Sequence, residues 1–519
     1  MKRSIALGHC ICDVRQPCPC DLFKQQDLCH CAGEKVPPIT GPVRLTEHVR
    51  NAGCASKISK GVLEEVLTGL PEINDPRVVV GASAGDDAGV IMLCEETATI
   101  LTVDVFCPAV DDPYTFGQIA AANSLSDIYA MGAVPQVALS IIGFPIDSLP
   151  ANAMREILRG GIEKMGEAGV CVIGGHSIND EEVKCGFAVV GTCPGNAFVR
   201  NAGAQVGDVI VLTKPLGSGI AVFAHQVGRA SDEMVAPVAK SMATLNKLGG
   251  QLMVEQGAHA ATDVTGFSLL GHMAEIVQNS QIEATLEFDA IPLFEGVAEL
   301  AAADVVPGAV ERNRESVPED LLEMSDLTAG QQAILFGPET SGGLLVFLPA
   351  RNVEKFVADL RAGGVTGHVI GRVTASHPQG RIRVTTKKAE VFGMTTPAQN
   401  PPAASSCCCA DESVAAAAAR GAQSPAPSSA DVLPVPADAD AFKAYMAAVG
   451  KGDALGAKYS KLIGVALSVM SKCEPCVRIN AKAARDAGAT EQEIAEAVSL
   501  GIGFGGAPVA MFYNALRQK

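Results

Sequence analysis

A cysteine and a lysine lie three residues apart in a loop of small residues, Gly53-Cys54-Ala55-Ser56-Lys57. A positive charge beside a thiol lowers the pKa of that thiol, and an ammonium group also stabilises a phosphoryl group. Most cysteines near a lysine are inert, but the small residues here favour a mobile active-site segment. Cys54 and Lys57 are therefore the candidate catalytic pair.

Four aspartates lie downstream in short stretches of small residues. These stretches are Gly85-Asp86-Asp87-Ala88, Thr102-Val103-Asp104, Ser126-Asp127-Ile128 and Thr262-Asp263-Val264-Thr265-Gly266. Any one of these aspartates alone is best explained as a helix cap or a solvated loop residue. Together they are typical of the hard oxygen ligands that hold Mg²⁺ on a polyphosphate.

Two further features suit a bound nucleotide. Asn123 lies four residues before Asp127 in a helical stretch, so both side chains share one helix face. Gly174-Gly175-His176-Ser177 follows a strand-like run and suits the approach of a phosphate or ribose, although it is also compatible with an ordinary tight turn. Neither a Walker A loop nor a Rossmann fingerprint is present in these loops.

The elements that must position these residues alternate between strands and helices from about residue 42 to 395. We expect strands at 78–80, 98–103, 137–142, 171–173, 188–191, 208–212, 343–348 and 382–385. Asp104 is expected to end the strand at 98–103. We expect helices at 115–131, 151–168 and 234–256. This pattern predicts an α+β fold in two successive lobes, residues 41–200 and 201–395.

The remainder of the chain differs in composition. Residues 396–437 are rich in Ala, Ser and Pro, which is typical of a flexible linker. Residues 438–519 are helical throughout by pattern, with helices expected at 441–449, 458–470, 477–487 and 491–499. We therefore expect a separate all-α domain at the C-terminal end.

Composition excludes some classes of protein. The chain of 519 residues is 48% hydrophobic and carries a net charge of −17, which argues against a nucleic-acid partner. An acidic protein that binds a nucleotide must neutralise the phosphates locally, usually with a divalent metal. No apolar run is long enough for a membrane span or a signal peptide, so we expect a cytoplasmic protein without membrane association.

Residues from about 42 to 395 resemble selenophosphate synthetase (selenide, water dikinase). The stretches named above carry the resemblance, together with the continuous run from Asp104 to Gly132 and the loop Thr340-Ser341-Gly342-Gly343. One difference is visible: family members often have Gly-Cys after the nucleophile, whereas this chain has Ala55-Ser56. A second thiol beside the first is therefore not expected.

The resemblance implies the two-lobed aminoimidazole-ribonucleotide-synthetase-like (PurM-like) fold and a homodimer. It implies that ATP, selenide and water give selenophosphate, AMP and orthophosphate, with Mg²⁺ as cofactor. By motif position, Cys54 and Lys57 are catalytic, and the metal ligands are Asp87, Asp127 and Asp263. The implied nucleotide contacts are Lys57, Asp87, Asp104, Asn123, Asp127, Gly174, Gly175, His176 and Ser177.

Two other functions are compatible with the sequence. One is another ATP-dependent enzyme of the same fold that acts on a ribonucleotide or thiamine phosphate; such substrates need no soft nucleophile at Cys54. The other is a non-enzymatic selenium or metal carrier whose central domain only binds nucleotide. Release of AMP that depends on selenide would exclude the carrier.

The C-terminal domain carries Cys473-Glu474-Pro475-Cys476 at the expected start of a helix, where a thiolate is stabilised. Over about 80 residues it resembles the carboxymuconolactone decarboxylase / alkylhydroperoxidase D-like family. That family's peroxidases usually have Glu and His where this chain has Lys461 and Asn480. We expect dithiol exchange or selenium binding at Cys473 and Cys476, and a purely structural dimerisation module is the alternative.

The first 40 residues hold three Cys-x-Cys pairs. This spacing suits capture of a soft metal or of selenium but matches no standard zinc ribbon, and a redox-sensitive tail is the alternative. The six cysteines are Cys10, Cys12, Cys18, Cys20, Cys29 and Cys31. No function is predicted for Cys407 to Cys409 in the linker.

Overall fold

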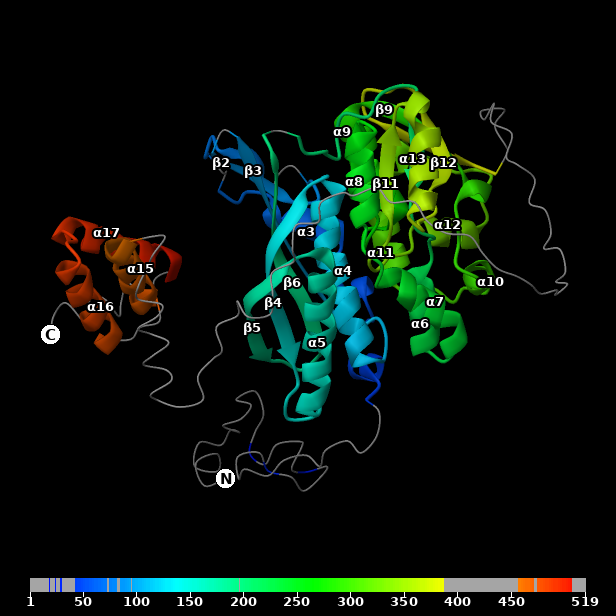
Figure 1. Cartoon of the computed structure of the whole chain (residues 1–519). Helices are drawn as coiled ribbons and strands as arrows, with labels where there is room; N and C mark the ends of the chain where they lie inside the picture. Colours follow the sequence, from blue (N-terminus) through cyan, green and yellow to red (C-terminus); the bar gives the residue numbers. More distant parts are fainter. Residues whose placement is uncertain are drawn as a thin grey trace, which may run out of the picture. The chain divides into compact units, whose positions relative to one another are not determined.

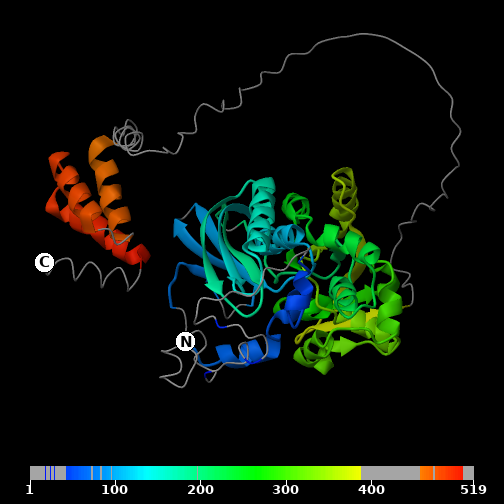
Figure 2. The ribbon, with the colours of Figure 1, turned by 90° about the horizontal axis from the view of Figure 1, so that it is seen from below.

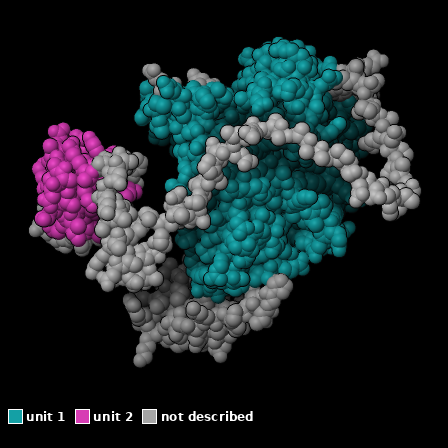
Figure 3. All heavy atoms as spheres, in the orientation of Figure 1, with its two compact units in different colours: residues 1–398 teal, residues 399–519 magenta. Residues whose placement is uncertain are grey.

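The computed structural model describes residues 43–386, except 72–73, 82–84, 95 and 196, and residues 456–505, except 471–473. Of the first 42 residues it describes only Cys18, Lys24 and Cys29. Several predictions therefore lie outside the described residues. They concern the N-terminal cysteines other than Cys18 and Cys29, the linker with its cysteines, the helix at 441–449 and Cys473. The chain divides into two units, Met1–Ala398 and Gln399–Lys519 (Figure 3).

The first half of unit 1 forms a six-stranded sheet in the order β1-β2-β3-β6-β4-β5. Two 3₁₀ turns and a helix precede it: η2 (Leu45–His48), η3 (Cys54–Ser56) and α3 (Lys60–Leu67). The strands are β1 (Val78–Val80), β2 (Gly89–Cys94), β3 (Thr97–Phe106), β4 (Val134–Phe144), β5 (Cys171–Asn179) and β6 (Lys184–Pro194). Only the β4–β5 pair is parallel.

Helices α4 (Pro113–Ala130) and α5 (Ala151–Ala168) pack on one face of this sheet (Figures 1 and 2). The α4 helix begins after Asp112, whose carboxylate accepts a hydrogen bond from the backbone N–H of Thr115 at 2.8 Å. The backbones of α4 and α5 are in direct contact where the two helices cross. A side chain at Gly117 would lie 1.9 Å from the carbonyl oxygen of Ile157, so this position requires glycine.

The second half of unit 1 forms a seven-stranded sheet in the order β10-β13-β9-β12-β7-β11-β8. Its strands are β7 (Val209–Leu212), β8 (Ala260–Asp263), β9 (Ile282–Glu287), β10 (Leu322–Glu323), β11 (Leu344–Leu348), β12 (His368–Ser376) and β13 (Arg381–Thr385). The helices are α6 (Ser218–Gln226), α7 (Asp232–Met242), α8 (Lys247–Glu255), α9 (Ser268–Ser280), α10 (Val297–Ala302), α11 (Ala309–Ser316), α12 (Ala329–Leu335) and α13 (Ala350–Ala362), with 3₁₀ turns η5 (Phe288–Ala290) and η6 (Glu319–Leu321).

The central strands of this second sheet are buried on both faces. Every residue of β7 and of β11 is buried. Val209 and Val211 share one hydrophobic cluster with residues of α8 and α13, whereas Ile210 and Leu212 belong to the cluster that also includes the core of the first sheet. A continuous hydrophobic core therefore holds the two halves of unit 1 together, and this fixes their functional loops relative to each other.

Unit 2 is helical in its described part, as the sequence predicts. Its helices are α15 (Gly456–Met470), α16 (Glu474–Asp486) and α17 (Glu491–Gly505). They share a small core of Val465, Val469, Val477, Ala484, Ile494, Ala497 and Val498. No helix in the described ranges is long and apolar enough to cross a membrane.

Three local predictions are wrong. The helix expected over 234–256 is two helices, α7 and α8, because the Asn246 side chain between them bonds the Ser126 hydroxyl and the carbonyl oxygen of Gly342. Asp104 does not end its strand, since β3 continues to Phe106. Gly174 to Ser177 form neither a loop nor a turn but part of strand β5.

Candidate functional site

The Cys54 segment is a hydrogen-bonded turn between the two halves of unit 1. Gly53 has φ +59°, and a side chain there would lie 2.5 Å from the Thr340 hydroxyl oxygen. The backbone N–H of Cys54 donates to this same oxygen at 2.9 Å, and the Ser56 hydroxyl donates to the carbonyl oxygen of Gly53 at 2.8 Å. Cys54 is only 2% exposed. The structure therefore places Cys54 in a buried, hydrogen-bonded turn.

The electrostatics of the Cys54 thiol also differ from the prediction. Burial raises the pKa of Cys54 to about 12, although the positive charge of Lys57 lowers it as expected. The prediction of a lowered pKa for Cys54 is thus wrong, because the cost of desolvating a thiolate is larger than the stabilisation by the nearby Lys57 cation. The thiol donates to Asn123 Oδ1 over a sulfur–oxygen distance of 3.8 Å. Cys54 is a neutral thiol at neutral pH in this structure.

Lys57 points into the same site and pairs with Asp104. Its Nζ lies 2.8 Å from the Asp104 carboxylate, and the Asn123 side-chain amide donates to this carboxylate as well. Burial is the largest single influence and lowers the pKa of Lys57, but the charge of Asp104, the hydrogen bond to it and the other nearby acidic groups together raise the pKa by more, so it is raised overall. Lys57 is therefore a charged ammonium group beside the thiol.

The other three predicted aspartates each form a hydrogen bond with a hydroxyl group of another residue of the same chain. Thr102 donates to Asp127, Thr262 donates to Asp87 Oδ1 at 2.7 Å, and Ser126 bonds Asp263. One oxygen remains without a hydrogen-bond partner on two of them, Asp87 Oδ2 and Asp263 Oδ2, and both atoms are buried. Buried polar atoms are normally paired, so these two oxygens are free ligand positions.

The four aspartates that the sequence singles out lie close enough to repel one another. Burial raises the pKa of Asp87 and of Asp127 well above the usual range, and the charge of Asp263 raises both further. Burial likewise raises the pKa of Asp263 to about 6, with Asp104 adding to the effect. Gathered buried carboxylates favour binding of a cation.

No three side chains of His, Cys, Asp or Glu converge into a ready-made metal site within the described residues. This arrangement still fits Mg²⁺, which binds proteins through one or two carboxylates and takes its other ligands from water and substrate phosphates. The two free carboxylate oxygens, Asp87 Oδ2 and Asp263 Oδ2, are the observation that carries the fit. Asp86 pairs with Arg200 at 3.1 Å, and its charge also raises the pKa of Asp87.

The loop before β11 closes the site from the second half of the unit. The backbone N–H of Ser341 donates to Asn123 Oδ1 at 2.8 Å. Glu339 holds the loop, since its carboxylate accepts the backbone N–H groups of Gly217 at 2.7 Å and Ser218 at 2.9 Å. Thr340 to Gly343 stand out in the sequence as a loop of small residues, whereas Glu339 was not among the predicted site residues. Its signal was an acidic residue directly preceding those small residues.

A buried histidine lies near the lysine and was also missed. His272 on α9 shares a hydrogen bond with the Thr265 hydroxyl, 3.2 Å from its Nε2, and its ring lies against Phe267. Burial lowers the pKa of His272 to about 3, and the charges of Lys60 and Lys57 lower it further. His272 is therefore neutral, and protonating it would add a third positive charge here.

Gly174, Gly175, His176 and Ser177 lie apart from the carboxylates within one chain. They are exposed residues of the edge strand β5. Asp104 on β3 is in register with Phe187 on β6, Ser140 on β4 and Gly175 on β5. Three strand spacings, about 14 Å, separate Asp104 from Gly175.

The described part of unit 2 contains a different kind of polar contact. The Asn480 amide donates to the Ser468 hydroxyl at 2.9 Å, and this hydroxyl donates to the carbonyl oxygen of Gly464 at 2.6 Å. Asn480 thus links α16 to α15 at the position where a histidine was expected. Cys476 is disulfide-bonded.

Three family models match the chain. Residues 85–195 match the N-terminal domain of AIR synthase related protein, and residues 205–383 match its C-terminal domain. Residues 436–518 match the carboxymuconolactone decarboxylase family. These matches confirm the predicted two-lobed PurM-like fold and the family of the C-terminal domain.

Relatives of known name match the central region over nearly their full length. A selenide, water dikinase from Carboxydothermus hydrogenoformans is 43% identical over 334 residues, which cover 64% of this chain and 97% of the relative. A selenide, water dikinase from Myxococcus xanthus is 44% identical over 337 residues, covering 64% and 96%. The likeness to a solved thiamine monophosphate kinase from Aquifex aeolicus is weaker, with 18% identity, a TM-score of 0.45 and coverage of 63% and 97%.

Proposed function

The chain belongs to the selenide, water dikinase family, and from this premise we propose that it makes selenophosphate from selenide, ATP and water. In the first step a selenium–phosphorus bond forms at the γ-phosphorus of ATP while the bond to the bridging oxygen breaks, which releases ADP. Water then cleaves the ADP, so the final products besides selenophosphate are AMP and orthophosphate. No net oxidation or reduction occurs.

One observation carries this proposal: residues from both halves of unit 1 meet around Cys54 and Lys57. The Cys54 N–H bonds Thr340, the Asn123 oxygen accepts from Ser341, and Thr262 donates to Asp87. A thiol, an ammonium group and several carboxylates in one buried place suit transfer of a phosphoryl group to a soft nucleophile. Neither a ribonucleotide nor a thiamine phosphate would need the thiol, so those alternatives are not favoured.

We propose that Asp87, Asp127 and Asp263 hold Mg²⁺ together with phosphate oxygens. When bound, Mg²⁺ neutralises the phosphate charge that these carboxylates would otherwise repel. The free oxygens of Asp87 and Asp263 are the available ligand atoms. Asp104 is occupied by Lys57 and Asn123, so its part is to orient these two groups toward the nucleotide.

The two catalytic residues divide the work. The Lys57 ammonium, kept charged by Asp104, stabilises negative charge on the phosphoryl group that is transferred. The Cys54 thiol positions the selenide by a sulfur contact, in a place from which bulk water is excluded. Asn123 contacts the Cys54 thiol, the Asp104 carboxylate and the N–H of Ser341. It thereby holds the thiol and the Lys57–Asp104 pair in fixed positions relative to each other.

We propose that the active form is a homodimer built on the open face of the six-stranded sheet. Leu101, Val103 and Leu139 lie on the face away from α4 and α5, and they are 45%, 60% and 44% exposed. An apolar sheet face of this kind marks an interface. Gly174 is in register with Leu139 on this face, so the nucleotide contacts predicted for Gly174 to Ser177 would be made across the dimer.

We propose that unit 2 is a thiol redox module that acts on reduced selenium through Cys473 and Cys476, and that the protein works in the cytoplasm, where ATP is available. Unit 2 has Lys461 and Asn480 at the positions where peroxidases of its family usually have Glu and His. The Asn480 amide is engaged with Ser468 and cannot take up a proton as a histidine could. Peroxide reduction is therefore not part of the proposal.

The test is ³¹P NMR of the full-length chain with Mg²⁺, ATP and selenide under anaerobic conditions. We expect a selenophosphate signal together with equal amounts of AMP and orthophosphate. Cys54→Ser should lose this activity, while Cys171→Ser, which changes an exposed free cysteine, should keep it. Formation of AMP without selenide, or full activity of Cys54→Ser, would contradict the proposed chemistry.

A further inference from the structure

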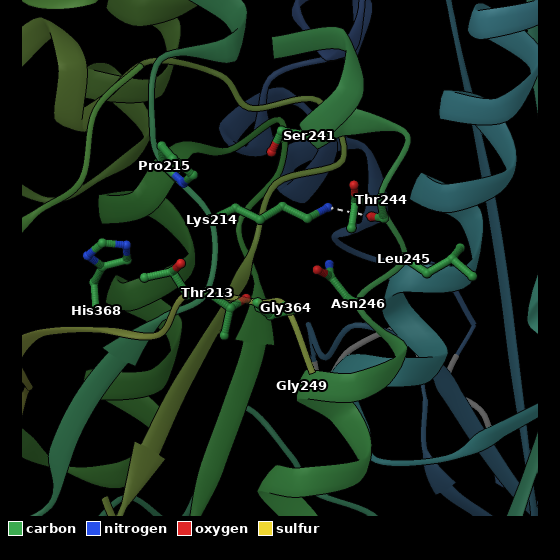
Figure 4. Close-up of a pocket in the computed structure, with 12 residues that line it drawn as sticks. Thr213, Lys214, Pro215, Ser241, Thr244, Leu245, Asn246, Gly249, Gly364 and His368 are labelled. Atoms are coloured by element: carbon green, nitrogen blue, oxygen red, sulfur yellow. Dashed lines mark hydrogen bonds between the residues drawn. The ribbon is translucent and has the colours of Figure 1, made fainter. Parts of the chain in front are cut away.

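A second polar pocket lies at the end of strand β7, outside the group of catalytic residues (Figure 4). Its volume is about 230 Å³, and its walls come from residues 213–215, 241–249 and 364–368. Pockets for drug-sized ligands measure roughly 300–1,000 Å³. This pocket therefore suits an ion or a small molecule better than a nucleotide.

Lys214 crosses the pocket, and its ammonium group ends at the loop of Thr244 and Asn246 (Figure 4). The residue is 7% exposed. Its Nζ donates to the carbonyl oxygens of Thr244 and Ser341, each at 2.8 Å. An ammonium group has three protons to donate. One donor of Lys214 thus remains for a group inside the pocket.

No carboxylate in the described part of the chain forms an ion pair with Lys214. Burial lowers the pKa of Lys214 to about 7; the charge of Asp263 opposes this effect, and the charge of Lys164 adds to it. Burying a cation without a direct counter-ion is costly. An anion in the adjacent cavity would remove that cost.

Other donors face the same cavity. The Ser241 hydroxyl has no hydrogen bond to any described residue, and the Thr213 oxygen accepts from the N–H of Leu344, which leaves its proton free. Helix α8 begins at the pocket without a side-chain cap, because the Asn246 amide bonds Ser126 and Gly342 instead. Its first N–H groups are therefore available, as at many anion sites.

We propose that this pocket is a binding site for orthophosphate, the tetrahedral oxyanion that matches a ring of donors around one buried ammonium group. The oxyanion would accept hydrogen bonds from Lys214, from the Ser241 and Thr213 hydroxyls and from the start of α8. The site is separate from the place where phosphoryl transfer is proposed. Lys214 nevertheless bonds Ser341, whose N–H bonds Asn123, so the occupied pocket adjoins the catalytic loop.

The experiment is isothermal titration calorimetry of the full-length chain with inorganic phosphate in the presence of EDTA. Without a divalent metal the carboxylates of the catalytic site repel phosphate, so binding there is suppressed. We expect one saturable site with a dissociation constant of about 1 mM or tighter. Lys57→Ala should bind phosphate within twofold of the wild type, and Lys214→Met should bind at least tenfold more weakly.

A pair of variants at Ser241 keeps the test decisive if Lys214→Met fails to fold. Ser241→Asp places a negative charge at the pocket and should weaken phosphate binding at least tenfold, whereas Ser241→Asn matches its size without the charge and should stay within threefold. Absence of saturable binding up to about 10 mM phosphate would overturn the proposal. So would equal affinities of Ser241→Asp and Ser241→Asn, or loss of phosphate binding in Lys57→Ala.

Discussion

The catalytic region of unit 1 and the helical module of unit 2 use polar groups in opposite ways. In unit 1 the bond between Cys54 and Thr340 joins residues 286 positions apart, whereas the bond between Asn480 and Ser468 in unit 2 spans 12 positions. The first arrangement gathers charges that repel one another in a buried place, and the second links neutral groups of neighbouring helices. A bound cation would therefore relieve repulsion in the first arrangement and has no such role in the second.

This difference teaches how function is recognised in each unit. The unit 1 site carries unpaired buried oxygens, at Asp87 and Asp263, which mark it as a binding site. The Asn480–Ser468–Gly464 contacts of unit 2 form a closed chain of hydrogen bonds that helps to hold α15 to α16. A motif that looks catalytic by family position can therefore be structural.

The largest expected effect is at Lys57. Lys57→Ala removes the ammonium group that we propose stabilises the transferred phosphoryl group, and we expect AMP formation that depends on selenide to fall at least about 10³-fold. The redox state of the Cys473–Cys476 module should not change, as measured by thiol labelling. A Lys57→Ala protein with near wild-type activity would remove the cation from the mechanism.

The next largest effect is expected at Asp263, where the substitution should lower activity and raise stability. Asp263→Asn removes a carboxylate that we propose as a metal ligand, and we expect activity to fall about 10²-fold. Because the folded pKa of Asp263 is raised to about 6, its ionisation costs stability above that pH. At pH 7.5 in EDTA, Asp263→Asn should therefore be more stable than the wild type by about 2 kcal/mol in urea unfolding. A less stable variant would contradict the mutual repulsion of these carboxylates.

Acid sensitivity should separate the two units, since residues 438–519 contain no histidine. The folded pKa of His272 is lowered to about 3 from 6.5, so its stabilising neutral form is present above pH 6.5 and is lost as the pH falls. Between pH 7 and 5, the wild type should lose about 2 kcal/mol more unfolding free energy than His272→Gln. If the unfolding free energies of the two proteins fell equally with pH, His272 would not be the cause of the acid sensitivity.

The smallest effect is expected at Asn480. Asn480→Ala removes one hydrogen bond between α15 and α16, and we expect unit 2 to lose about 1 kcal/mol of stability. Selenophosphate formation should be unchanged, as judged by ³¹P NMR. Ser468→Ala is the matched control and should cost a similar amount, while a large loss of enzyme activity in Asn480→Ala would couple unit 2 to catalysis.

Some corrections trace to forces that are not local. Helical periodicity joined 234–256 into one helix, and only the bonds of Asn246 to Ser126 and Gly342 show why the chain breaks there. The lowered pKa expected for Cys54 followed from its distance in sequence to Lys57, but desolvation depends on the whole fold. The burial of Glu339 and Lys214 could not be predicted from the sequence, because it is set by distant segments.

The sequence by itself determined the family, the α+β class of the central region, the helical C-terminal domain and the identity of the catalytic candidates, because residue types and their local spacing encode these. Tertiary structure alone decided that the charges of Asp87, Asp104, Asp127 and Asp263 act on one another, that the Cys54 thiol is neutral, and that Gly174 to Ser177 lie on an edge strand. Charge repulsion and desolvation depend on distances through space. A hydrophobic core brings distant segments of the chain together, so these distances cannot be read from the sequence.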